Sequence, residues 1–186
     1  MRRIPNARSH QVAGVLRRCL KLAGRKVSEF GDVLLAGSAR RGRALSKDVD
    51  ILIVLPARLR GRPGLLAGLE CSASRSLKFG REVQSGARRR SVDFELADGG
   101  HIRRHRLDLF LAFADEMPFA LFHHTGSHNY NIRVRAHAKA RGWLLNQYGL
   151  FDRTTRRPVA GSKRLRDEAA LARFLGLSVR APAERE

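Results

Sequence analysis

The sequence has few cysteines and no long apolar run. Its two cysteines, Cys19 and Cys71, give neither a zinc-binding spacing nor a disulfide framework. Cys19 keeps step with the apolar positions of a predicted helix, so we expect it to be a small buried side chain. No apolar stretch approaches membrane-spanning length, and no secretory core follows the first residues. We therefore expect an intracellular protein that is not secreted.

Acidic residues are also scarce. The 186 residues include 17 acids against 37 lysines and arginines, a formal net charge of +20. A basic excess of this size indicates a polyanionic partner, and nucleic acid is the usual one. Only six of the 37 are lysine, a bias that genome composition also produces, so the inference depends on the net charge. The length allows one domain or two small ones.

Two acids begin the most apolar stretch of the chain. Asp48 and Asp50 are two residues apart, so on a β-strand both side chains project from the same face. The residues 51–55 that follow are all apolar and predict a strand buried on both faces, which Pro56 ends. Paired carboxylates of this kind are typical ligands of a divalent cation.

A glycine-containing basic turn precedes these acids. Gly37 and Ser38 follow a short predicted strand at 33–36, and Arg40 and Arg41 come next. Backbone N–H groups, a hydroxyl and guanidinium groups beside two carboxylates can hold a polyphosphate together with its cation. Either half of this pattern alone occurs by chance. Together they resemble the signature of the nucleotidyltransferase superfamily and indicate nucleotidyl transfer.

A third acid lies in a later predicted strand. Arg106, Asp108 and Phe110 alternate with leucines and therefore share one face. A carboxylate in an apolar strand is costly unless it is paired or bound to metal. We expect Asp108 to join Asp48 and Asp50 in a two-metal site, with Arg106 orienting a carboxylate. The alternative is an ordinary Asp108–Arg106 ion pair on a solvated strand.

The remaining pattern predicts mixed helices and strands without internal repeats. Ser9 is the expected N-cap of a helix over 10–23 that ends at Gly24. The other expected elements are a helix at 63–71, strands near 75–79, 81–86 and 91–97, an Asp98-Gly99-Gly100 turn, two helices between 116 and 141 broken at Gly126, a hairpin at 146–151 and a helix at 166–175.

A run of motifs in the second half indicates a family. His124-Thr125-Gly126-Ser127 is followed by Tyr130-Asn131, by Arg135 and by Asn-Gln-Tyr-Gly-Leu-Phe at 146–151. With the turn and the acids, residues 37–151 resemble family X DNA polymerases, and most of all the minimal viral form with only a palm and a C-terminal domain. The resemblance implies an α+β fold, with a mixed-sheet palm at 1–116 and a nucleotide-binding domain at 117–186.

The resemblance also implies roles for single residues. Asp48, Asp50 and Asp108 match the family's metal-binding acids, which use two Mg²⁺ ions for which Mn²⁺ can substitute. Ser38, Arg41 and Ser46 match its triphosphate contacts. The full set of implied nucleotide-binding residues is Gly37, Ser38, Arg41, Ser46, His123, His124, Gly126, Asn131 and Arg135.

Asn131 and Arg135 match residues that reach the minor-groove edge of the nascent base pair. They are four apart on one predicted helix and so face the same way. Minor-groove acceptors occur at every base pair, so donors placed there test the shape of the pair without reading its sequence.

Two histidines depart from the family pattern. His123 and His124 replace an aromatic pair that flanks the incoming sugar. Because free imidazole has a pKa near 6.5, we expect nucleotide affinity or mispair tolerance to change between pH 6 and 8. His128 stands where the family often has an acid. His124 and His128 also offer a structural zinc site as an alternative, although Gly126 interrupts the helix between them.

About 35 residues precede the Gly37 turn. We therefore expect no N-terminal lyase domain, no deoxyribose-phosphate lyase activity and no helix-hairpin-helix motif. DNA is then expected to be held by surface charge at Arg17, Arg18, Lys21 and the turn at 88–90, for which the alternative is a solvated loop.

Together these features predict a template-directed DNA polymerase that fills short gaps in base excision repair. The expected partners are gapped or nicked double-stranded DNA, dNTPs and a DNA ligase of the same pathway. We expect a monomer without membrane contact, in the nucleus, a cytoplasmic viral factory or the virion. The alternatives are a template-independent nucleotidyltransferase, which does not need the Asn131/Arg135 helix, and a non-catalytic basic nucleic-acid-binding protein, against which the three acids argue.

Overall fold

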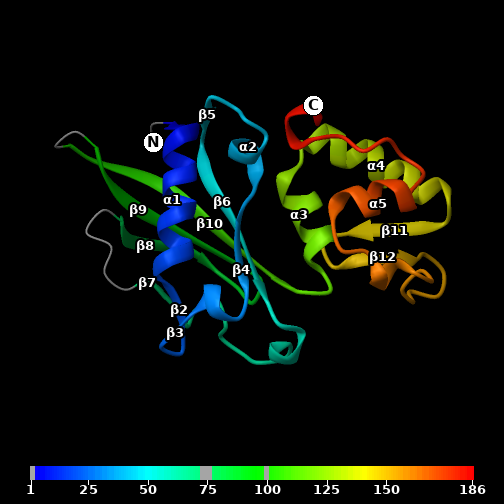
Figure 1. Ribbon diagram of the computed structural model, residues 1–186, viewed down its shortest axis with the longest axis horizontal. Coiled ribbons are helices and arrows are strands. Elements are labelled where there is room, and N and C mark those ends of the chain that lie inside the picture. The colour runs from blue at the N-terminus through cyan, green and yellow to red at the C-terminus, as the bar shows by residue number, and fades with distance from the viewer. Residues whose placement is uncertain (1–2, 72–76, 99–100) are drawn as a thin grey trace.

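The computed structural model describes residues 3–71, 77–98 and 101–186, which form two lobes side by side (Figure 1). The larger lobe is a five-stranded sheet with α1 across one face, and the smaller lobe consists of helices and a two-stranded hairpin. The chain passes from the first to the second between Phe113, which ends β10, and Met117, which begins α3. The division into domains after residue 116 stays a prediction.

The central sheet has the strand order β4-β6-β10-β9-β8. Its strands are β4 (Asp32–Leu35), β6 (Asp48–Leu55), β8 (Leu77–Ser85), β9 (Arg89–Asp98) and β10 (His101–Phe113). Strands β6 and β10 are parallel and the other neighbouring pairs are antiparallel, so the sheet is mixed, as expected. The predicted strand at 48–55 is confirmed, and its residues 51–55 are buried.

Helix α1 (Asn6–Cys19) covers one face of this sheet. Its buried residues Val12, Val15 and Leu16 recur three or four positions apart and pack into the main apolar core, which includes alternate residues of β6 and β10. This packing fixes the orientation of the strands that carry the three acids.

The predicted helix at 10–23 is wrong at both ends. The helix begins at Asn6, whose side-chain amide donates to the carbonyls of Ala39 at 2.7 Å and Arg43 at 3.1 Å, and Ser9 is buried within it. Its C-terminal part instead forms β2 (Leu20–Leu22), because tertiary strand pairing overrides a helical pattern.

Small strands and turns complete the larger lobe. Strand β1 (Ile4–Pro5) pairs with β5 (Leu45–Ser46), and β2 pairs with both β3 (Arg25–Lys26) and β7 (Leu69–Cys71). The helical elements here are α2 (Gly37–Arg40), η1 (Val27–Glu29) and η2 (Ala57–Leu59).

Two predictions, for residues 63–71 and for Cys19, are wrong. No helix forms at 63–71: residues 63–68 are turns, with Gly64 at a φ of +69°, which breaks helical winding. Cys19 is half-buried and disulfide-bonded, so the expectations of a buried apolar Cys19 and of no disulfide are both wrong. The sequence spacing did not show this because the predicted elements lacked β7, which brings position 71 opposite Leu20.

The edge of the sheet is more continuous than predicted. A single strand β8, with irregular register between Phe79 and Gln84, replaces the two strands expected near 75–79 and 81–86, although 75–76 lie outside the described residues. Strand β9 already begins at Arg89, which shortens the arginine turn. Residues 99–100 of the predicted Asp98-Gly99-Gly100 turn also lie outside the described ranges.

The smaller lobe follows the predicted order. It contains α3 (Met117–Thr125), α4 (His128–Ala140), β11 (Trp143–Asn146), β12 (Gly149–Asp152), η3 (Ser162–Arg164), α5 (Glu168–Phe174) and η4 (Pro182–Glu184). The predicted break at Gly126 is confirmed, and its φ of +70° favours glycine. Phe119, Phe122, Tyr130, Leu150 and Leu171 belong to its separate apolar core.

Candidate active site

Three acidic side chains lie at one edge of the central sheet. Asp48 and Asp50 are on β6, and Asp108 is on β10 as the register partner of Asp50. Residues in register on adjacent strands project from the same face of a sheet, so the structure brings the three predicted acids side by side. Among the described residues, no three His, Cys, Asp or Glu side chains converge closely enough to hold one metal ion.

The glycine turn lies directly against these acids. The Ala36 N–H donates to the Asp50 carbonyl over 2.8 Å, which brings α2 to the start of β6. Gly37 has a φ of +63°, and a Cβ atom there would lie 1.8 Å from Oδ2 of Asp50. Only glycine allows both this backbone conformation and this approach to the carboxylate.

Burial makes Asp48 and Asp50 difficult to ionise. It raises the pKa of Asp50 to about 7, with repulsion from Asp48 and Asp108 adding to the shift, and it also raises the pKa of Asp48. Asp108 is buried, and its Oδ1 has no hydrogen-bond partner within the described part of the chain. Crowded carboxylates and an unpaired buried oxygen are what a divalent cation would neutralise, so these residues fit Mg²⁺.

The arginine beside Asp108 is Arg89, not Arg106. Arg89 Nη2 donates to Asp108 Oδ2 over 2.8 Å, whereas Arg106 Nε donates over 3.2 Å to Asp93, its register partner on β9. The predicted role of Arg106 and the alternative Asp108–Arg106 ion pair are both wrong. Directly opposite residues on adjacent strands are about 4.5–5.5 Å apart, which favours the cross-strand partner.

The acids border a cavity of about 420 Å³ between the two lobes. It is lined by Gly37, Ser38, Arg41, Asp48, Asp50, His123, His124, Thr125, Gly126, His128, Asn131, Ile132 and Arg135. Of the predicted nucleotide contacts only Ser46 is missing from this lining. It is buried behind Ser38, whose hydroxyl donates to the Ser46 hydroxyl over 2.9 Å.

Helix α4 presents two polar side chains to the cavity. Ser127 caps the helix by accepting from the Tyr130 N–H over 3.3 Å. The Asn131 amide donates to the His123 carbonyl over 2.8 Å, and Arg135 donates to Nδ1 of His123. Asn131 and Arg135 thus face the same way, as their spacing predicts, and His123 holds both.

The two histidines are neutral near pH 7. Burial and the nearby Arg135 lower the pKa of His123 to about 4. Burial, His123 and Arg89 lower the pKa of His124 to about 3. His124 also stacks on Phe110, with 3.9 Å between ring centres. The prediction that these histidines titrate between pH 6 and 8 is therefore wrong, because imidazolium is poorly solvated here.

The alternative zinc site is not formed among the described residues. His128 is exposed at the start of α4, and His124 is packed against Phe110. No third ligand of the described chain joins them.

Arg40, which ends α2, and Arg41, which follows it, connect the lobes. Arg40 donates to the Thr125 hydroxyl over 2.6 Å and to the buried Glu168 over 2.6 Å, and Arg185 pairs with the same carboxylate over 2.5 Å. Arg41 donates to the Thr125 carbonyl, while its Nε is buried without a partner in the described ranges. Arg41 also lines the cavity.

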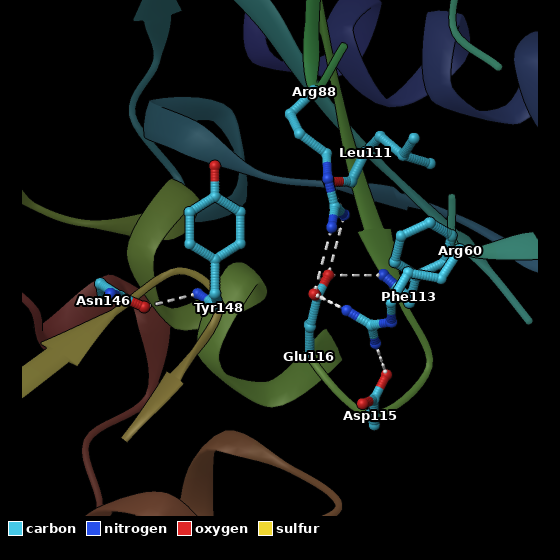
Figure 2. A network of polar contacts seen from close by, with 8 residues as sticks. All are labelled: Arg60, Arg88, Leu111, Phe113, Asp115, Glu116, Asn146 and Tyr148. Atoms are coloured by element: carbon cyan, nitrogen blue, oxygen red, sulfur yellow. Dashed lines mark hydrogen bonds and ion pairs between the residues drawn. The ribbon is translucent and has the colours of Figure 1, made fainter. Parts of the chain in front are cut away.

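The arginines at 88–90 are engaged within the protein. Figure 2 shows Arg88 and Arg60 on the carboxylate of Glu116, which also accepts from the Phe113 N–H over 2.9 Å. Arg90 pairs with Glu82 over 2.8 Å. These arginines are thus paired within the protein, Arg89 is nevertheless exposed, and their contact with DNA stays a prediction. Arg17 and Arg18 are exposed, and their contact with DNA stays a prediction.

Sequence reasoning missed several residues of the site region. Arg89, Arg60, Glu116 and Glu168 all contact partners far away along the chain. Only the density of arginine at 88–90 drew attention to that region.

Among the described residues, no helix is both long and apolar enough to cross a bilayer.

The chain is similar to known proteins over most of its length. The family model for the DNA polymerase beta thumb matches residues 120–186. Repair DNA polymerase X of African swine fever virus is 34% identical over 154 residues, which cover 83% of this chain and 81% of that protein. DNA polymerase lambda of Rattus norvegicus is 30% identical over 160 residues, which cover 81% of this chain and 28% of that protein.

Solved structures show the same fold. The ternary gap complex of Leishmania infantum polymerase beta matches with a TM-score of 0.78 and 22% identity, over 100% of this chain and 71% of that one. With the α+β fold and mixed sheet described above, these relatives show that the chain is a DNA-directed DNA polymerase and belongs to family X.

Proposed function

We propose that the protein adds a dNMP from a dNTP to a primer 3′-hydroxyl, directed by a template, and fills short gaps during base excision repair. The observation that carries this proposal is one cavity with two faces. Asp48, Asp50 and the Gly37 turn lie on one side, and Asn131 and Arg135 lie on the other. A triphosphate and a base pair can therefore be held at once.

Two Mg²⁺ ions are the proposed cofactors, and Mn²⁺ is expected to substitute. Asp48, Asp50 and Asp108 would hold them. Bound divalent ions activate the primer hydroxyl and stabilise the departing pyrophosphate. The protein contributes the three carboxylates on two parallel strands, with Asp108 buried and Asp48 and Asp50 half-buried.

The triphosphate is proposed to bind at α2. Arg41 and Ser38 line the cavity, and the Ser38 hydroxyl donates to that of Ser46. Gly37 lets the backbone pass close to the acids. A guanidinium and N–H groups at a turn bind phosphate oxygens well.

Template direction is proposed to come from α4. Asn131 and Arg135 both line the cavity, and the Asn131 amide donates one N–H to the His123 carbonyl and has a second. Donors there can contact the minor-groove acceptors that all correct base pairs share. A template-independent transferase has no use for this pair of residues.

A second basic cavity supports binding at the far side of a gap. It has a volume of about 270 Å³ and lies on α4 with Arg133, His137, Ser178 and Arg180 in its lining. It lies on the same helix as Asn131, and we propose that it binds a downstream 5′-phosphate. We also propose that the protein acts as a monomer inside the cell, in the nucleus or a viral factory, with a DNA ligase to seal the nick.

The test is primer extension on a duplex with a one-nucleotide gap, each dNTP supplied separately. Incorporation of the complementary nucleotide alone, faster with a 5′-phosphate at the gap than without it, is the expected result. Arg180→Ala should remove that phosphate effect and leave extension of an open primer–template unchanged. Addition of any dNTP regardless of the template would instead favour the template-independent transferase.

A further inference from the structure

Arg89 contacts one of the three acids although it lies on a different strand from all of them. Its Nη2 donates to Asp108 Oδ2 over 2.8 Å. The Asp108 side chain is 7% exposed, whereas that of Arg89 is 47% exposed. The guanidinium also lies 5.5 Å from the ring centre of Phe110, which itself stacks on His124. A buried carboxylate is thus paired with a cation that still has access to water.

Asp108 and Asp48 border different cavities. Asp48 borders the nucleotide cavity, whereas Asp108 borders an adjoining cavity of about 460 Å³ that Arg89 and Phe110 also line. Asp50 borders both cavities. Although the strand register places all three acids together, no three ligands of the described chain converge. Oδ1 of Asp108 is unpaired within the described chain but buried, and Arg89 occupies the other oxygen, so an ion held by all three acids has to compete with Arg89 as the Asp108 carboxylate turns toward it.

We propose that Arg89 is the internal counter-ion of the acid cluster, which a divalent cation has to displace from Asp108. The inference rests on the proposed function, because it takes the three acids to be metal ligands. Arg89 acts through Asp108 and is a positioning residue. Its half-exposed guanidinium can return to water when Asp108 turns to the ion, so the exchange is reversible.

If Arg89 instead oriented Asp108 for the metal, its removal would weaken metal binding. Groups that hydrogen-bond a metal ligand often orient it for the metal, and losing such a group weakens metal binding about 10–100-fold. A competing counter-ion, in contrast, lowers the apparent metal affinity while it is present. A half-exposed ion pair is worth at most about 1 kcal/mol, which corresponds to about a fivefold change in a dissociation constant. Removing the pair should therefore strengthen metal binding about fivefold. The direction of the change therefore separates the two roles.

The experiment is a titration with Mn²⁺ alone, at mildly alkaline pH, with free Mn²⁺ measured by electron paramagnetic resonance. Arg89→Met keeps the side-chain length but removes the charge, and it should lower the Mn²⁺ dissociation constant about fivefold. Arg89→Lys should restore the wild-type value. The matched control is Arg104→Met on β10, where Arg104 pairs across strands with Glu95 over 3.2 Å and is 76% exposed; its affinity should not change.

A gain of affinity is not a result that a damaged fold produces. Unchanged or weaker Mn²⁺ binding by Arg89→Met would overturn the proposal, and so would Arg89→Lys binding as tightly as Arg89→Met. Asp50→Asn separates this failure from failure of the proposed function. If Asp50→Asn loses Mn²⁺ and Arg89→Met shows no gain, only the counter-ion role is wrong. If Asp50→Asn binds Mn²⁺ normally, the proposed metal site fails as well.

Discussion

Replacing Glu116 with alanine should destabilise the junction between the two lobes. Its buried carboxylate accepts from Arg88 at 2.9 and 3.2 Å, from Arg60, and from the Phe113 N–H at 2.9 Å (Figure 2). Leaving a buried N–H unpaired costs about 1–3 kcal/mol. Each partly exposed arginine loses an ion pair worth about 0.5–1 kcal/mol. We expect the free energy of unfolding to fall by about 3 kcal/mol.

The neighbouring Asp115 provides a matched control. It also pairs with Arg60, but its side chain is 48% exposed, against 5% for Glu116. Urea unfolding of Asp115→Ala should therefore show a loss below about 1 kcal/mol. If the two variants lost equal stability, burial of the Glu116 carboxylate would not be what secures this junction, and the reasoning would be wrong.

Three further predictions concern the site. The pKa of His123 is lowered to about 4 and that of His124 to about 3, so below about pH 6.5 the unfolded chain binds protons that the folded protein does not. In urea unfolding, the free energy of unfolding should therefore fall as the pH is lowered toward 4. The fall should be smaller in a variant with both histidines replaced by Phe. Because the pKa of Asp50 is raised to about 7, its ionisation destabilises the folded protein increasingly between about pH 4 and pH 7, and in full above pH 7; Asp50→Asn should stabilise the metal-free protein at pH 8 by about 2–4 kcal/mol, and a loss would contradict this. A Cβ atom at Gly37 would clash with Asp50, whereas a Cβ atom at Gly42, which also has a left-handed φ, would meet no atom within 4 Å. In primer-extension assays, Gly37→Ala should lose incorporation and Gly42→Ala should keep it. Equal activities of the two variants would refute the clash.

The sequence predicted the elements that local patterns determine. The strand at 48–55 was evident because five buried apolar residues follow the two acids, and the break at Gly126 because a glycine stands between two helical patterns. The register of Asp50 with Asp108 could only be expected, since parallel pairing depends on the whole sheet.

The parts that failed depend on contacts between distant segments. Residues 69–71 form a strand because β2 pairs with them, and nothing local in 63–71 indicates that pairing. Arg106 was assigned to Asp108 from its position two residues away, but the opposite residue on β9 is closer. The histidines were given an ordinary pKa because burial between the lobes is not visible in a sequence.

The central claim is that the three acids support template-directed nucleotide addition. Its most direct test is single-turnover incorporation by Asp108→Asn on a one-nucleotide gapped duplex, with the affinity for that DNA measured in parallel. We expect incorporation to fall at least about a hundredfold, since removing one stabilising group from a transition state has effects of that size, while the DNA affinity stays nearly unchanged. A loss of incorporation only in proportion to a loss of DNA affinity would contradict the account.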